Sequence, residues 1–253
     1  MPRKRVIPVI LLSGESLVKT TRFSNRVYIG DPCNTVKIFN EFEVDELMVL
    51  DINASKNKAE PNFDMLRELA SECFMPISYG GGINSLSIAS KVFELGYEKV
   101  VVNSSGITDL SLIGQLADRF GSQAVTFSLD YRKHWGRRNF AYIESGSKRV
   151  KTDMFELLHQ AEANGAGEVV LTSIEREGTW NGLDLETLRD VAGQLSIPVI
   201  ANGGIGSVSD IRAEFDQTNV SAVGVGSLFV YQKKGMGVLV HVPTEVEYLE
   251  FPN

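Results

Sequence analysis

The sequence has few of the features that mark membrane, secreted or nucleic-acid-binding proteins. No apolar run reaches the roughly 18 residues of a membrane-spanning helix. The two cysteines, Cys33 and Cys73, are too few for a disulfide framework or a zinc site of cysteines alone. Lys and Arg total 25 against 32 Asp and Glu, so the net charge of −7 gives no basic field to attract nucleic acid. We therefore expect a cytoplasmic protein of globular composition that binds no membrane, nucleic acid, metal or cofactor.

Short apolar runs alternate with amphipathic stretches. Eight runs predict strands, at 6–12, 47–50, 77–79, 100–102, 124–129, 169–171, 199–201 and 222–225. Several are unbroken Val, Ile and Leu runs, which are typical of parallel strands buried on both faces. The amphipathic stretches predict helices at 62–73, 85–95, 110–120, 153–163, 184–195 and 207–215, with N-caps that include Ser85, Asp153, Asp184 and Ser207. This alternation indicates an α/β fold with right-handed crossovers.

The chain resembles itself at a shift of 122 residues. Residues 75–85 align with 197–207, and 66–70 align with 188–192, without a gap from Glu46 to Ser105. Aligned glycines, helix faces and strand starts together favour duplication over chance. We therefore predict one (β/α)8 TIM barrel of 253 residues. Its half-barrels are about 1–122 and 123–230, followed by a C-terminal extension, 231–253.

A glycine pair follows the third predicted strand, and a second pair follows the seventh. These pairs are Gly81-Gly82 and Gly203-Gly204, and each runs into a predicted helix N-terminus, where backbone N–H groups can face an anion. Polar residues follow the adjacent strands, namely Asn103 and Ser104 after the fourth and Gly226 and Ser227 after the eighth. Two copies at symmetric positions favour a ligand with two phosphates, or phosphate ions, over simple tight turns.

Two segments depart from a plain barrel. Residues 131–151 read as a hairpin inserted after the fifth strand, and their basic and aromatic side chains either bind a sugar phosphate or partner, or are merely solvated. After Lys233-Lys234, residues 238–243 read as extended chain rather than as the usual last helix, because Gly and Pro are frequent there.

The chain resembles the cyclase subunits of imidazole glycerol phosphate synthase, the HisF family. The matching stretches are 5–8, 45–55, 80–83, 120–125, 165–168 and 171–174, and the similarity runs from about residue 4 to about residue 230. The resemblance implies a (β/α)8 barrel with two phosphate sites. It also implies that a glutaminase subunit docks on the N-terminal face and sends ammonia through the barrel to a bisphosphate ribulosyl substrate.

The family's catalytic acid–base pair is only half present. Its two aspartates lie at the ends of the first and fifth strands, and the matching positions here are Leu11 and Asp130. A leucine cannot transfer a proton, a step worth about 100- to 10,000-fold in rate. Other substrate-loop positions are Lys19, Asp51 and the segment Glu177-Gly178-Thr179. Lys19 and Asp51 match the family, Thr20 replaces a glycine, and Glu175 and Glu177 replace two aspartates.

The opposite end of the predicted barrel keeps the family's charged residues. Arg5, Glu46, Lys99 and Glu168 each precede a predicted strand, so by composition alone they are solvated strand starts or a ring of salt bridges. In the family the residues at these four positions form the gate of the ammonia channel. The resemblance therefore implies that ammonia still enters the barrel although the cyclase acid is lost.

One branch of the family, the glycosyl-amidation-associated (WbuZ-like) proteins, has this combination. Those proteins are thought to supply ammonia to an enzyme that converts an acetamido sugar to an acetamidino sugar of a surface polysaccharide. We therefore expect a glutaminase and a sugar-amidating enzyme as partners. Two alternatives stay open at this point: a true cyclase of histidine biosynthesis, and a free-standing phosphosugar isomerase or binding protein.

Overall fold

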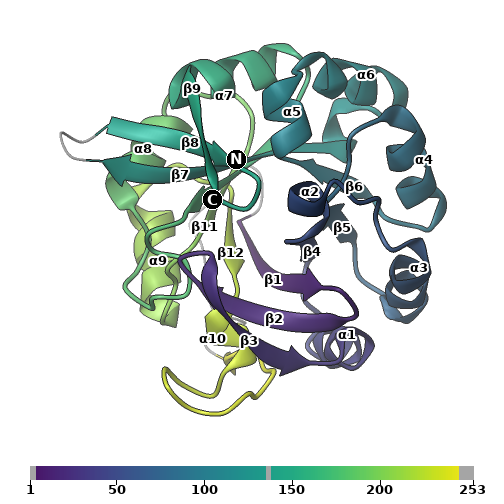
Figure 1. Cartoon of the computed structure of the whole chain (residues 1–253). Helices are drawn as coiled ribbons and strands as arrows, with labels where there is room; N and C mark the ends of the chain where they lie inside the picture. The colour runs from purple at the N-terminus through teal and green to yellow at the C-terminus, as the bar shows by residue number, and fades with distance from the viewer. Residues whose placement is uncertain (1–3, 135–137, 245–253) are drawn as a thin grey trace.

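The chain folds into a closed barrel of eight parallel strands, which the computed structural model describes over residues 4–134 and 138–244 (Figure 1). Each predicted strand run is confirmed. The barrel strands are β1 (Arg5–Ser13), β4 (Leu47–Asp51), β5 (Ile77–Gly80), β6 (Lys99–Val102), β7 (Val125–His134), β10 (Glu168–Ser173), β11 (Val199–Asn202) and β12 (Ala222–Val225). Parallel pairing runs through all of them, and β10 pairs with β7 to close the ring. The predicted (β/α)8 TIM barrel is therefore confirmed.

Helices surround the barrel and cover the outer faces of its strands (Figure 1). The longer ones are α1 (Pro32–Glu41), α3 (Phe63–Glu72), α4 (Leu86–Glu94), α6 (Ser111–Phe120), α7 (Met154–Ala163), α8 (Leu185–Ala192) and α9 (Val208–Gln217). The short ones are α2 (Ala54–Asn57), α5 (Ser104–Thr108), the 3-10 turn η1 (Ser122–Ala124) and α10 (Ser227–Val230). No described helix is long and apolar enough to cross a membrane.

The internal repeat reappears in the element boundaries. Helix α3, strand β5 and helix α4 begin at residues 63, 77 and 86, and α8, β11 and α9 begin at 185, 199 and 208, each 122 positions later. Ser85 and Ser207 also cap their helices in the same way, since each side chain accepts a hydrogen bond from the third backbone N–H that follows. Equivalent sequence therefore gives equivalent local structure in the two halves.

Two hydrophobic clusters stabilise the barrel, one outside the strands and one inside. The larger cluster fills the layer between strands and helices, where Phe39, Leu69 and Leu116 are fully buried. The smaller one fills the barrel interior and includes Ile7, Met48 and Val170. The interior is a packed core rather than an open pore, as in other barrels of this size.

Two hairpins extend the C-terminal end of the barrel. After β1 the chain forms β2 (Ser16–Thr21) and β3 (Ser24–Gly30), a hairpin that is not among the strands predicted from the sequence. After β7 it forms β8 (Arg138–Ile143) and β9 (Lys148–Asp153), which agrees with the hairpin expected at 131–151, although residues 135–137 lie outside the described ones. Both hairpins lie over the barrel mouth (Figure 1).

One predicted N-cap residue lies at the expected position but does not cap with its side chain. Asp184 occupies the N-cap position of α8, but its side chain makes no hydrogen bond to the helix backbone. Its carboxylate accepts hydrogen bonds from the hydroxyls of Tyr131 and Thr187 at 3.2 and 2.8 Å instead. The buried Tyr131 hydroxyl needs an acceptor, and this need outweighs the local capping preference.

After a turn at residues 232–236, the described part of the C-terminal segment runs back beside α10. Tyr231 and Val238 form an isolated antiparallel bridge, and the backbone N–H groups of Leu239 and His241 donate to Val230 and Phe229. The rest of the predicted extension, 245–253, lies outside the described residues.

Candidate active site

The predicted site residues gather in one pocket at the C-terminal end of the barrel. The pocket is lined by side chains or backbone from all eight barrel strands or from the loops that follow them. Of the residues predicted from sequence it contains Leu11, Lys19, Asp51, Gly81, Gly82, Asn103, Ser104, Asp130, Glu177, Gly178, Gly203, Gly204, Gly226 and Ser227. Active sites of (β/α)8 enzymes lie at this end.

Asp130 lies deep in the pocket, midway along β7, at the point where this strand begins to pair with β8. Its carboxylate accepts hydrogen bonds from the Thr172 hydroxyl and from Nδ2 of Asn103, the latter at 3.1 Å. Burial raises the pKa of Asp130 to about 7, against the two hydrogen bonds and with a smaller contribution from the nearby Glu177 carboxylate. A carboxyl group that titrates near neutrality can act as a general acid or base.

No second carboxylate replaces the missing one at the end of β1. Leu11 lines the pocket and packs with Leu50 against the inner hydrophobic cluster. The other pocket carboxylates are engaged: Asp51 Oδ1 accepts from the backbone N–H groups of Asn53 and Ala54 at 2.8 and 3.1 Å. Glu177 Oε2 accepts from the backbone N–H of Phe23 at 3.2 Å. The wall beside Leu11 is therefore apolar where acid–base chemistry would need a partner for Asp130.

The two glycine pairs adopt backbone conformations that require glycine. Gly81 and Gly82 have φ of 133° and 70°, and Gly203 and Gly204 have φ of 95° and 117°. A side chain at Gly82 would place Cβ 2.7 Å from the carbonyl oxygen of Ala59, and one at Gly203 would place it 2.8 Å from that of Ser173. Both pairs lead to well-capped helices and face the same pocket. Phosphate binding by the two turns stays a prediction.

The polar residues expected to complete the phosphate sites begin short helices or contact the inserted hairpin. Asn103 and Gly226 are the N-cap residues of the short helices α5 and α10. The Ser104 hydroxyl accepts a hydrogen bond from the backbone N–H of Glu144, in the β8–β9 turn, at 3.0 Å. Ser145 in that turn donates to the carbonyl oxygen of Ile52 at 2.6 Å. The inserted hairpin is thus fastened over the first predicted phosphate site.

The β2–β3 hairpin covers the second site. Lys19 is buried, and its ammonium lies so close to Gly226 that a side chain there would collide with it. Burial lowers the pKa of Lys19, and Glu177 partly offsets this effect. The backbone N–H of Arg22 donates to the Glu177 carbonyl at 2.9 Å, so the hairpin is fixed to the loop after β10. Thr179, also expected in this substrate loop, donates its hydroxyl to Arg176 O at 2.7 Å rather than lining the main pocket.

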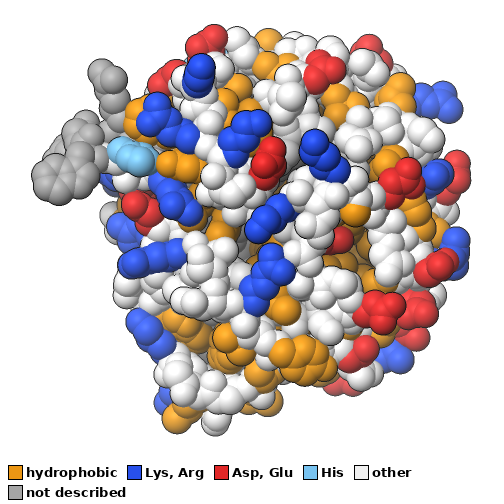
Figure 2. All heavy atoms as spheres, in the orientation of Figure 1, with side chains coloured by type: hydrophobic (Ala, Val, Ile, Leu, Met, Phe, Trp, Pro, Cys, Tyr) orange, Lys and Arg blue, Asp and Glu red, His pale blue; other side chains and the backbone are white. Residues whose placement is uncertain are grey.

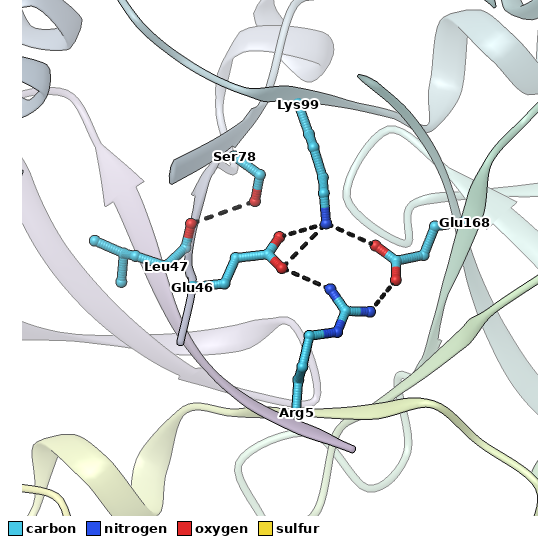
Figure 3. Close-up of polar contacts among 6 residues, drawn as sticks. All are labelled: Arg5, Glu46, Leu47, Ser78, Lys99 and Glu168. Carbon is cyan, nitrogen blue, oxygen red and sulfur yellow. Dashed lines mark hydrogen bonds and ion pairs between the residues drawn. The ribbon is translucent and has the colours of Figure 1, made fainter. Parts of the chain in front are cut away.

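At the N-terminal end of the barrel the four predicted gate residues form a closed ion ring (Figure 3). Arg5 pairs with Glu46 at 2.6 Å and with Glu168, and Lys99 pairs with the same two carboxylates at 2.9 and 3.2 Å. The glutamate side chains are only 6% and 7% exposed. The ring geometry agrees with the sequence prediction, whereas its use as a gate stays a prediction.

Three hydroxyl side chains lie on inward-facing positions of β5 and β7, between the ion ring and the pocket. Ser78 pairs in register with Lys99, and Thr126 pairs with Glu168, so both share the inward face of the ring residues. Ser128 follows Thr126 on the same face of β7 and lines the pocket. The Thr126 hydroxyl is buried without a hydrogen-bond partner. Sequence reasoning missed these hydroxyl groups because single Ser and Thr residues in apolar strands carry no motif.

Comparison with known proteins agrees with this architecture. A family model described as "Histidine biosynthesis protein" matches residues 5–235. A Pseudomonas aeruginosa protein named "Putative imidazole glycerol phosphate synthase subunit hisF2" is 47% identical over 243 residues, which cover 96% of this chain and 97% of the relative. "Imidazole glycerol phosphate synthase subunit HisF" of Streptococcus mutans is 36% identical over 231 residues, which cover 91% of this chain and 92% of the relative.

Fold and pocket together define a (β/α)8-barrel protein whose candidate active site lies at the C-terminal end. The chain belongs to the histidine biosynthesis protein family and is HisF-like within it. The family resemblance seen in the sequence is therefore confirmed.

Proposed function

We propose that this chain is the barrel subunit of a glutamine-dependent amidotransferase, which receives ammonia from a glutaminase and passes it on without cyclising a substrate. One observation carries this proposal: the ion ring is complete at one end of the barrel, while Leu11 stands in the pocket where Asp130 needs an acidic partner. Burying four charges costs free energy unless each of them is paired. The presence of the complete ring therefore favours a functional role for it.

The interior supports the passage of a small polar molecule. Ser78, Thr126 and Ser128 provide hydroxyls between the ring and the pocket. The Ser78 hydroxyl donates to the carbonyl oxygen of Leu47, whereas the Thr126 hydroxyl has no hydrogen-bond partner among the described residues. Ammonia both donates and accepts hydrogen bonds and can satisfy such a group in passing. The apolar residues that share the barrel interior, among them Val9 and Met48, exclude bulk water that would protonate it.

The consumer of the ammonia that fits this chain best is an enzyme that converts an acetamido sugar to an acetamidino sugar for a surface polysaccharide. The two glycine turns then hold a phosphorylated small molecule or phosphate ions at the exit. In this proposal the glutaminase docks on the N-terminal face, around the ring of Arg5, Glu46, Lys99 and Glu168.

A three-component assay tests the proposal. A HisH-type glutaminase and a sugar-amidating enzyme would be mixed with the acetamido sugar, with and without this chain. We expect glutamine-driven amidation to require the chain and ammonium-driven amidation to proceed without it. Lys99→Met should slow only the glutamine-driven reaction. Glutamine-driven amidation that is equally fast without the chain would contradict the proposal.

The second candidate is the cyclase reaction of imidazole glycerol phosphate synthase. It is favoured by the names of the relatives and by Asp130, whose pKa near 7 suits proton transfer. In this case Glu177 would have to supply the second carboxyl group from the loop after β10. Glu177 lines the same pocket as Asp130, but its carboxylate already accepts a hydrogen bond from the Phe23 N–H and faces the charge of Lys19.

A further inference from the structure

A second cavity lies beside the main pocket, at the edge of the barrel mouth. It has a volume of about 330 Å³ and is enclosed by the β2–β3 hairpin, the loop after β10 and residues 231–236. Lys19, Thr20, Gly178 and Ser227 line both spaces, so the cavity adjoins the second predicted phosphate site. None of the roles considered above uses it.

The wall shared by the two spaces has unused polar groups. Thr20 is 5% exposed, and its hydroxyl is buried without a hydrogen-bond partner. The neighbouring Lys19 ammonium is buried, with Glu177 as the charge that offsets its desolvation. A buried hydroxyl without a partner is costly, so a ligand that accepts its hydrogen bond gains affinity. Thr20 and Lys19 together suit an anionic acceptor such as a phosphate oxygen.

Two aromatic rings form the outer part of the same cavity. The rings of Trp180 and Tyr231 lie with their centroids 6.5 Å apart at 45°. Trp180 has a φ of 63°, a left-handed conformation that is unusual for a bulky residue. Its backbone packs against Gly206, where a Cβ would come within 2.8 Å of the Trp180 carbonyl. Strained residues of this kind persist mainly at functional sites.

The C-terminal segment adds a second basic residue to the cavity. Lys234 Nζ donates a hydrogen bond to the carbonyl oxygen of Thr179 at 2.8 Å and thereby ties the segment to the loop that carries Trp180. Lys and Arg side chains also spread over the middle and left of this face, although the chain as a whole is acidic (Figure 2). The face therefore favours an anionic ligand.

We propose that this cavity is a nucleotide subsite: it takes a nucleoside diphosphate, with phosphate against Lys19, Thr20 and Ser227 and with the base stacked on Trp180. Ring stacking on Trp180 distinguishes this ligand from a plain sugar phosphate. The inference rests on the phosphate site of the proposed function but not on the passage of ammonia. Binding is measured on the chain alone, so its failure is distinguishable from failure of the amidation assay.

Calorimetric titration of the full chain tests the subsite. The probes are UDP, CDP, ADP and GDP, with inorganic pyrophosphate as the ligand that lacks a base. We expect at least one nucleoside diphosphate to bind about tenfold or more tightly than pyrophosphate, because stacking of one base on an aromatic ring contributes a factor of that order. If no nucleotide binds more tightly than pyrophosphate, the proposal is wrong.

Variants separate the base from the phosphate contacts. Trp180→Leu should weaken nucleotide binding about tenfold and leave pyrophosphate binding unchanged, and Trp180→Phe should restore most of the affinity. Trp180→Gly removes the ring and also relieves the left-handed backbone strain. It should therefore lose the affinity that base stacking contributes without lowering the melting temperature, which excludes misfolding as the cause of weaker binding. Equal nucleotide affinity in the native chain and in Trp180→Gly would overturn the assignment of the base to Trp180.

Discussion

Asp130 is the residue whose chemistry depends most on its surroundings. The unfolded chain releases this proton near pH 3.8, whereas the folded chain releases it near pH 7 because burial disfavours the carboxylate. Between these values the folded state binds more protons, so Asp130 destabilises the fold increasingly as the pH rises, and fully above about pH 7. The raised pKa of Asp130 therefore makes the free energy of unfolding depend on pH in this range.

Replacing Asp130 by Asn should consequently stabilise the chain more at pH 8 than at pH 5. We expect the gain in unfolding free energy to grow by about 1–2 kcal/mol over that interval, since the pocket leaves the carboxyl partly open to solvent. Urea unfolding at the two pH values measures it. Asp64→Asn is the control, because that side chain is 92% exposed and should show no such dependence. A gain that is the same at both pH values would contradict the raised pKa.

A second prediction concerns the stability that one residue of the ion ring contributes. Lys99→Met removes one cation from two buried carboxylates, and Arg5 remains to pair with both. We expect a loss of about 2 kcal/mol, less than the roughly 3–5 kcal/mol of a carboxylate left wholly unpaired. Chemical denaturation of Lys99→Met and of Lys91→Met measures it. Lys91 lies 3.9 Å from Glu60 with its side chain 50% exposed, and its loss should cost less than about 0.5 kcal/mol.

At the residue scale, the sequence predicted which side chains meet but not how they are held. Arg5, Glu46, Lys99 and Glu168 begin or precede strands, and strand starts share one end of a parallel barrel, so their meeting follows from topology. The burial of Lys19 against Gly226 does not follow, because it depends on how the first hairpin folds back. Nor could spacing reveal that Asp184 serves Tyr131 rather than its own helix.

At the scale of elements, the β2–β3 hairpin is held in place by a glycine in another loop. Gly178 has a φ of 69°, and a side chain there would collide with the Thr20 carbonyl. Gly178→Ala should therefore loosen the hairpin, lower stability by about 2 kcal/mol and speed proteolysis within residues 16–30. Limited proteolysis with mass analysis of the fragments detects the cut.

Gly14 offers a matched control for this experiment. It has a φ of 66° in the β1–β2 turn, and nothing lies within 4 Å of a Cβ placed there. Gly14→Ala should cost only the backbone strain, about 1 kcal/mol, and should leave cleavage of the hairpin nearly unchanged. Equal cleavage rates in the two variants would mean that contact with Gly178 does not hold the hairpin.

The barrel strands were predictable because unbroken apolar runs mark strands buried on both faces, and the 122-residue repeat fixed their number. The first hairpin was not predictable in the same way. Residues 24–28 are exposed in β3, so they lack the alternation of buried and exposed positions that reveals a strand. Helix α1 was missed as well, although Asp31 caps it and Pro32 begins it.

At the scale of the whole molecule, the two ends of the barrel differ in what they retain. The N-terminal end has a ring of four paired charges, and the C-terminal end has two glycine turns, Asp130 and an apolar wall at Leu11. Hydroxyl side chains on β5 and β7 lie between these ends. This asymmetry is the basis of the proposal that the chain passes ammonia on without cyclising a substrate.

The claim that this chain does not catalyse cyclisation is tested by an ammonium-driven cyclase assay of the unmodified chain, run beside Leu11→Asp. The bisphosphate ribulosyl substrate and ammonium salt make the assay independent of any glutaminase. We expect the native chain to turn over at least about 100-fold more slowly than a typical enzyme rate of 1–1,000 per second, because one partner of the acid–base pair is absent. Turnover by the native chain within that range would contradict the account and identify a working cyclase.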